Sequence, residues 1–158
     1  MSSTAVAPEK VLEQLLGVLQ EGFEGPQQRW SYFTDGGPAA GWFAMLDGLS
    51  AEEASKPSGP NGTTIAAHVH HMVFSLSASV DFILDRWEGR DWSESWRVST
   101  VDEAQWRELR ERLRAGYEAL VAAFRERALA DERSFGGALA AVAHVAYHLG
   151  AVRQKLAG

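Results

Sequence analysis

The sequence predicts an all-α protein, a four-helix bundle in which the first connection is long. Four segments repeat apolar residues at helical spacing, and no segment alternates apolar and polar residues as a half-buried strand does. The chain has 158 residues, 46% of them apolar, which is the size of one domain with a sizeable core. We therefore expect residues 1–158 to form a single helical domain.

The first two long helices are expected at residues 8–23 and 63–87, where apolar residues recur every three or four positions. Gly89 is expected to end the second of them. The connection between them, residues 25–62, is rich in Gly, Pro, Ser and aromatic residues, and we expect only one short helical piece in it, at residues 38–46.

The third long helix is expected to start at Thr100, because Glu103 follows at the spacing of a capping box. Its apolar stripe is Trp106, Leu109, Leu113, Tyr117, Leu120 and Phe124. Its other face carries alternating arginine and glutamate residues, which we interpret as a solvated face. The last helix is expected to follow Gly137 and to run to Leu156.

Composition excludes several kinds of function. Lys and Arg total 15 against 21 Asp and Glu, a net charge of −6, so we expect no nucleic-acid partner. The chain has no cysteine, which excludes disulfides, thiolate metal sites and a cysteine nucleophile. No signal peptide or membrane-spanning run can be read, so we expect a cytoplasmic protein with no membrane partner.

The histidines are the most unevenly placed residues. All five lie in two predicted helices, as His68, His70 and His71 in the second and His144 and His148 in the last. Residues four apart share a helix face, so His144 and His148 can grip a single ion. The residues in the same direction on the helix are small, namely Gly137, Ala140, Ala141 and Ala151. We interpret this strip as the lining of a cavity, although a close helix–helix seam has the same composition.

The same reasoning selects among the other three histidines. His71 shares its direction with the small residues Ala67, Ser75 and Ala78, whereas His70 points about 100° away and is expected to face solvent. His68 lies nearer the apolar stripe and stays the alternative ligand. We therefore predict a metal site formed by His71, His144 and His148.

Three imidazoles without a thiolate suit Zn or Ni, and also Fe or Mn, and leave a coordination position free for water or substrate. No general base can be named, because Asp81 and Asp85 lie two or more turns from His71. Trp92 and Trp96 are candidates to cover the open end of the bundle, and Tyr147 lies beside the two histidines of the last helix.

These motifs resemble the DinB-like superfamily, which includes YfiT-like proteins. The resemblance rests on TIAAHVHHMVFSL from Thr64 and AHVAYHLGAVRQ from Ala143. It implies a four-helix bundle of up-down-down-up type, often a homodimer, with a divalent ion, often Ni or Zn, held by three histidines. Carried over to this sequence, these are His71, His144 and His148. The family contains thiol-dependent S-transferases that use bacillithiol, mycothiol or glutathione, as well as isomerases.

The hypothesis that follows is a metal-dependent enzyme, a low-molecular-weight-thiol S-transferase or a related hydrolase, that acts on a small-molecule electrophile. The alternative is a non-catalytic stress-response protein in which the metal is structural or a ligand is only held. A third hypothesis is a metal-free bundle whose alanine strip is a dimer seam.

Overall fold

The computed structural model describes residues 5–37, 40–58 and 62–157. Every regular element in these ranges is a helix, so the all-α prediction is confirmed. In chain order they are α1 (Pro8–Glu24), α2 (Trp42–Asp47), α3 (Ala51–Ala54), α4 (Ile65–Ile83), the 3₁₀ helix η1 (Trp92–Trp96), α5 (Glu103–Arg127) and α6 (Glu132–Ala157).

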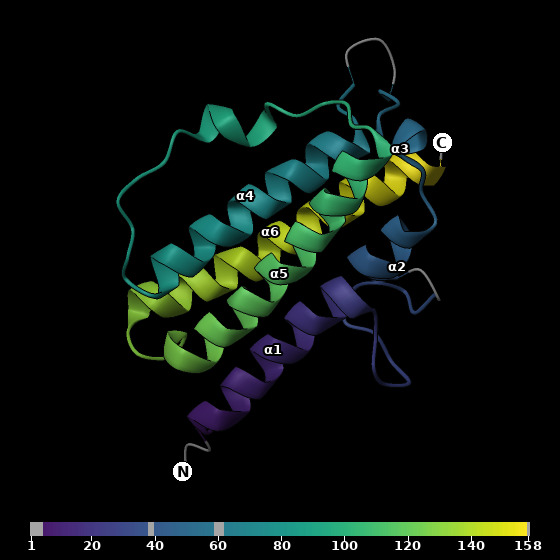
Figure 1. Cartoon of the computed structure of the whole chain (residues 1–158). Coiled ribbons are helices and arrows are strands. Elements are labelled where there is room, and N and C mark those ends of the chain that lie inside the picture. The colour runs from purple at the N-terminus through teal and green to yellow at the C-terminus, as the bar shows by residue number, and fades with distance from the viewer. Residues whose placement is uncertain (1–4, 38–39, 59–61, 158) are drawn as a thin grey trace.

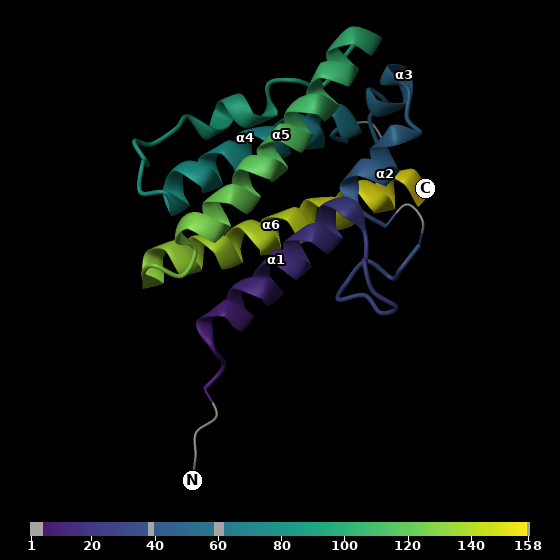
Figure 2. The ribbon, with the colours of Figure 1, turned by 60° about the horizontal axis from the view of Figure 1, so that its bottom comes forward.

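The four long helices lie side by side. Helix α4 packs against α5 and α6, and α1 packs against α6 and α5 (Figure 1). The two short helices, α2 and α3, lie at the end of the molecule where the C-terminus lies, in both views (Figures 1 and 2). The connection that follows α4 runs back along that helix and carries η1 before α5 begins (Figure 1).

The core follows the helical periodicity of the sequence. All six residues of the stripe predicted for α5, from Trp106 to Phe124, are buried. Helix α1 buries Leu15, Leu19 and Phe23, and its other apolar residues Val11, Leu12 and Leu16 pack partly buried against the core. Apolar burial of this kind provides most of the stability of a domain, so the stripes identify the interior correctly.

Helix α4 ends four residues earlier than predicted. Asp85 adopts a left-handed conformation with φ 59°, which turns the chain before Gly89 is reached. The N-cap of helix α5 is Asp102, two residues later than the predicted Thr100. The Asp102 side chain accepts from the backbone N–H of Gln105, and the Gln105 side chain accepts from the backbone N–H of Asp102.

Helix α6 starts five residues before the predicted boundary. Asp131 accepts a hydrogen bond from the backbone N–H of Ser134 at 2.7 Å, so Gly137 is a helical residue and not a boundary. In the first connection, helix α2 corresponds to the later part of the piece predicted at 38–46, of which residues 38 and 39 lie outside the described ranges. Helix α3 was not predicted; Ser50 and Glu53 form its capping box.

One buried carboxylate organises the loop after α1. Glu21 accepts hydrogen bonds from the backbone N–H groups of Tyr32 (2.7 Å), Phe33 (2.9 Å) and Thr34 (2.9 Å), and from nearby hydroxyls that include Ser31 Oγ (2.7 Å). Burial alone would raise the pKa of Glu21, but these donors outweigh it and lower the pKa to about 2. The loop is therefore fixed to α1 by an ionised side chain.

Helix α6 is long and apolar enough to cross a membrane by length and composition alone. This is weak evidence, because the core helix of a globular protein passes the same test. Here α6 packs against α1 and α4 and buries Ala138, Val145, Leu149 and Val152.

Candidate metal centre

The structure brings together the three histidines that were predicted as ligands. One ring nitrogen of each of His71, His144 and His148 lies within 4.8 Å of the other two. The Nε2 atoms of His71 and His144 are 3.1 Å apart, across the contact between α4 and α6. His144 and His148, one helical turn apart, have ring centroids separated by 4.6 Å. The i,i+4 spacing on α6 and the packing of α4 against it thus create one convergent group.

His68 joins this group without converging on the same point. Its Nδ1 atom is 3.0 Å from Nδ1 of His148, and its Nε2 atom is 3.0 Å from the hydroxyl of Thr63. His68 is therefore a neighbour of the three and not one of them. We call His68, His71, His144 and His148 the histidine cluster.

The prediction that His70 faces solvent is wrong. The ring is half-buried, and Nε2–H donates to the carbonyl oxygen of Glu94 at 3.1 Å. This bond attaches η1 to α4. The helical wheel gave the direction of His70 away from the cluster, but it contained no information about the segment that lies against that side of α4.

The 3₁₀ helix η1 covers the cluster. The indole of Trp96 stacks on the ring of His71, with centroids 4.2 Å apart and planes 15° apart. Trp92 lies further off, at 6.4 Å from the same ring. Between them, the fully buried Ser95 places its hydroxyl 2.9 Å from Nδ1 of His71. Trp92 and Trp96 were suggested to cover the open end of the bundle, whereas the structure places both against the ring of His71, in the segment that runs alongside α4. Ser95 was missed.

Burial keeps the histidine cluster uncharged. Desolvation lowers the pKa of His68 and of His71 to about 4 and that of His148 to about 3, with smaller contributions from neighbouring positive charge. Desolvation also lowers the pKa of His144. At neutral pH all four are neutral imidazoles, the form that offers a lone pair to a metal ion.

The three convergent rings fit a divalent ion. Two nitrogens bound tetrahedrally to one zinc ion at the usual bond length are about 3.3 Å apart, close to the 3.1 Å between the Nε2 atoms of His71 and His144. All three ligand nitrogens lie within 4.8 Å of one another, so small rotations of the rings would bring them onto one ion. Neutral, buried nitrogen donors are the ligand set that Zn, Ni and Fe accept.

The strip of small residues was predicted to line a cavity, but at Gly137 the structure shows a close contact between helices instead. Gly137 lies against α4: a Cβ atom added there would be 2.7 Å from Cδ1 of Phe82. Further along the strip, Ala140 is exposed and Ala141 is buried. At Gly137 the absence of a side chain lets α6 approach α4 closely. Within the convergent group, His71 and His148 are buried and His144 is half-buried.

The other side chains considered near the site have separate roles. Asp81 pairs with Arg90, and Asp85 pairs with Arg133, so both carboxylates are engaged away from the histidines. Tyr147 is 72% exposed, with its ring edge-on to His148 at 5.0 Å.

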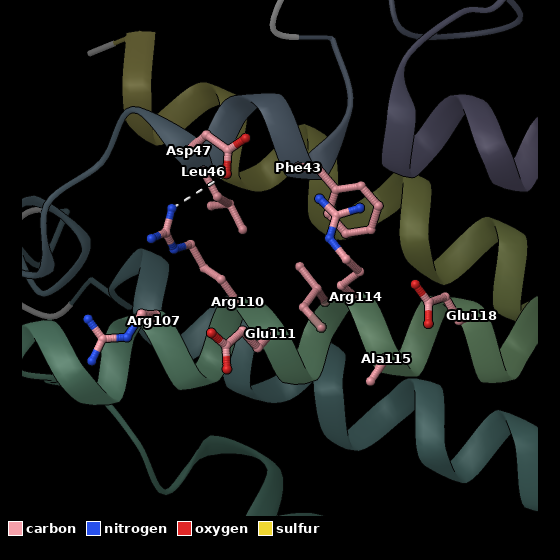
Figure 3. Close-up of a pocket in the computed structure, with 10 residues that line it drawn as sticks. Phe43, Leu46, Asp47, Arg107, Arg110, Glu111, Arg114, Ala115 and Glu118 are labelled. Carbon is pink, nitrogen blue, oxygen red and sulfur yellow. Dashed lines mark hydrogen bonds and ion pairs between the residues drawn. The ribbon is translucent and has the colours of Figure 1, made fainter.

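A hollow of about 350 Å³ lies elsewhere, between α2 and α5 (Figure 3). The guanidinium of Arg114 lies 3.9 Å from the centre of the Phe43 ring, and Arg110 reaches to Asp47 at 3.5 Å. Its charged lining is balanced, with three arginines and three carboxylates, namely Arg107, Arg110, Arg114, Asp47, Glu111 and Glu118. The charged face of α5 thus contacts α2 in part, and this hollow offers no convergent ligand set.

Comparison with known proteins gives one match. The sequence model of the DinB superfamily matches residues 40–152, which include η1, the whole of α4 and α5, and the histidine cluster. No curated protein and no solved structure matches the chain.

Proposed function

The chain belongs to the DinB superfamily, and on this basis we propose that it is a metal-dependent enzyme, a low-molecular-weight-thiol S-transferase or a related hydrolase. In this proposal His71, His144 and His148 hold a divalent metal ion. The observation that carries it is the convergence of three neutral imidazole nitrogens within 4.8 Å of one another.

The protein residues would bind the ion from one side only. The ligands come from α4 and α6, and Trp96 stacked on His71 keeps water from one face of that ring. His144 is half-buried, so a substrate would approach from its side. Three protein ligands leave a position for that substrate. When bound, a divalent ion supplies Lewis acidity that favours the thiolate form of a thiol at neutral pH.

Zn and Ni are the proposed metals, with Fe and Mn as alternatives, because imidazole ligands accept each of them. The up-down-down-up arrangement belongs to the same proposal. It is supported by the course of the chain in Figure 1, where α1 and α6 run one way and α4 and α5 run the other.

A second candidate is a non-catalytic protein in which the metal is structural. The observation that favours it is that His71 and His148 are buried, with Trp96 stacked on the ring of His71. The two candidates differ in the coordination shell: an enzyme needs an exchangeable position, whereas a structural site is closed. Binding of a small anion to the cobalt-substituted protein, seen as a change in the visible spectrum, indicates the open position.

The first experiment is elemental analysis of untagged protein purified without chelator, wild type against His144→Ala. About one equivalent of Zn or Ni in the wild type, lost in the variant, supports the proposed site. No metal in either protein, even after supplementation, refutes it. Thiol-transfer assays then compare the metal-loaded wild type with folded His148→Ala, which must lose turnover for the enzyme proposal to hold.

A homodimer is the proposed assembly. Leu139 and Tyr147 are exposed on α6, at 48% and 72%, and offer an apolar contact to a second copy. Light scattering after size-exclusion chromatography gives the mass, and a monomer at micromolar concentration contradicts this part of the proposal.

A further inference from the structure

A neutral imidazole can bind a metal ion only through the nitrogen that carries no proton. The hydrogen bond made by the other nitrogen decides which one this is. Two of the three convergent histidines have such a bond to a residue that the predicted site did not include. The structure gives the direction of the first of these bonds, and the second has partners in place for one particular direction.

The first bond lies between His71 and η1. The Ser95 hydroxyl donates to the carbonyl oxygen of Trp92 at 2.7 Å, and a hydroxyl has only one proton. Ser95 Oγ, 2.9 Å from Nδ1 of His71, must therefore accept a hydrogen bond from Nδ1–H. This leaves the lone pair of His71 on Nε2, the atom that faces His144 at 3.1 Å. Ser95 is fully buried, so water does not compete for this bond.

The second bond lies between His148 and His68, whose Nδ1 atoms are 3.0 Å apart, so one of the two carries the proton. If His148 is to present Nε2 as a ligand, its Nδ1–H must donate to His68. The proton of His68 then lies on Nε2, which is 3.0 Å from the hydroxyl of Thr63 and can donate to it. The partners needed for this arrangement are all in place.

We propose that Ser95 and His68 are positioning residues, which hold His71 and His148 in the tautomer that presents Nε2 to a metal ion. Ser95 acts through His71 from η1, and His68 acts through His148 from α4. This inference rests on the metal site of the proposed function, but it does not depend on what reaction, if any, the protein catalyses.

The tautomers can be measured directly in the metal-free protein by long-range ¹H–¹⁵N NMR of the imidazole rings at neutral pH. We expect both His71 and His148 to carry the proton on Nδ1. Ser95→Ala should release His71 alone, and His68→Leu should release His148 alone. In His68→Gln the amide oxygen still accepts from His148, so this variant should keep the Nδ1–H form.

Zinc affinity, measured by competition with a chromophoric chelator, provides the second readout. Loss of such a hydrogen-bond partner typically weakens metal binding by about 10- to 100-fold, and we expect this for Ser95→Ala and His68→Leu. His68→Gln should recover most of the affinity. Ser93→Ala is the matched control, because Ser93 lies two residues before Ser95, is exposed, and donates its hydroxyl hydrogen bond to Asp91 and not to a histidine. Circular dichroism establishes that each variant is folded.

The inference is overturned if His71 or His148 carries its proton on Nε2 in the wild type. It is also overturned if Ser95→Ala and His68→Leu bind zinc within about twofold of the wild type, well below the loss expected for such partners. If the tautomers and affinities are as expected but thiol transfer is absent, the enzyme proposal fails and the positioning roles stand. If Ser95→Ala does not fold, the inference is tested by the tautomers in the wild type and by the comparison of His68→Leu with His68→Gln.

Discussion

Metal binding should raise the temperature of thermal unfolding, because only the folded chain can form the site. His71 and His144 are 73 residues apart in sequence, so their nitrogens meet only when α4 packs against α6. An ion that binds the folded state alone stabilises it by about 2.7 kcal/mol at a free concentration one hundred times Kd.

The corresponding shift in Tm follows from the size of the chain. For 158 residues, the entropy of unfolding is on the order of 0.33 kcal/mol per kelvin. The stabilisation of about 2.7 kcal/mol therefore predicts an increase of about 8 °C in Tm. Scanning fluorimetry at a series of Zn and Ni concentrations measures it.

The variant that tests this is His144→Ala, which removes one ligand from the half-buried edge of the cluster. It should lose most of the shift while its metal-free Tm stays close to that of the wild type. Leu139→Ala is the control, because Leu139 is an exposed residue of the same helix and is outside the histidine cluster. A full shift in His144→Ala, or no shift in the wild type with either Zn or Ni, refutes the reasoning.

Three further predictions concern stability. The pKa values of the histidine cluster are lowered from the ordinary value of 6.5, so between pH 7 and 5 the unfolded chain binds more protons than the folded one. The free energy of unfolding should therefore rise with pH in this window. Equal urea midpoints at pH 5 and 7 in metal-free protein would contradict this. Glu21→Gln should cost about 2 kcal/mol in urea unfolding, because the loop after α1 loses an ionised acceptor, with zinc affinity unchanged; a cost below about 0.5 kcal/mol would argue against this role. Leu113→Ala, at a fully buried site of α5, should lower the free energy of unfolding by about 2–5 kcal/mol in the same assay. Arg112→Ala, at the exposed neighbouring position, should lower it by less than about 0.5 kcal/mol. Equal losses would mean that Leu113 is not in the core.

The spacing of residues along a single helix was sufficient to predict which of its residues share a face. The buried stripe of α5 and the shared face of His144 and His148 follow from residues three and four apart, and local sequence determines both. Helix ends were less accurate, because competing caps such as Asp102 lie within a few residues of the predicted Thr100.

Features that depend on a neighbouring element were missed. The strip containing Gly137 was interpreted as a cavity, because a helical wheel gives a direction and not the size of the side chain that meets it, here Phe82. His70 and Ser95 could not be connected from sequence, since their roles depend on where the chain between α4 and α5 lies. The convergence of His71 with the α6 histidines is a geometric observation, and metal binding there stays a prediction.

The path of the chain between α4 and α5 has a consequence for how substitutions can change the surroundings of the histidine cluster. Helix α4 has 19 residues and is about 28 Å long, and α5 starts beside its first residues, so the joining chain must travel back over the whole helix (Figure 1). The return path is imposed by topology and is required even if it makes no contact with the histidines. In this protein it carries Trp92, Ser95 and Trp96 over them. Substitutions in this one surface segment can therefore alter the surroundings of the histidines while the packing of the long helices is left intact.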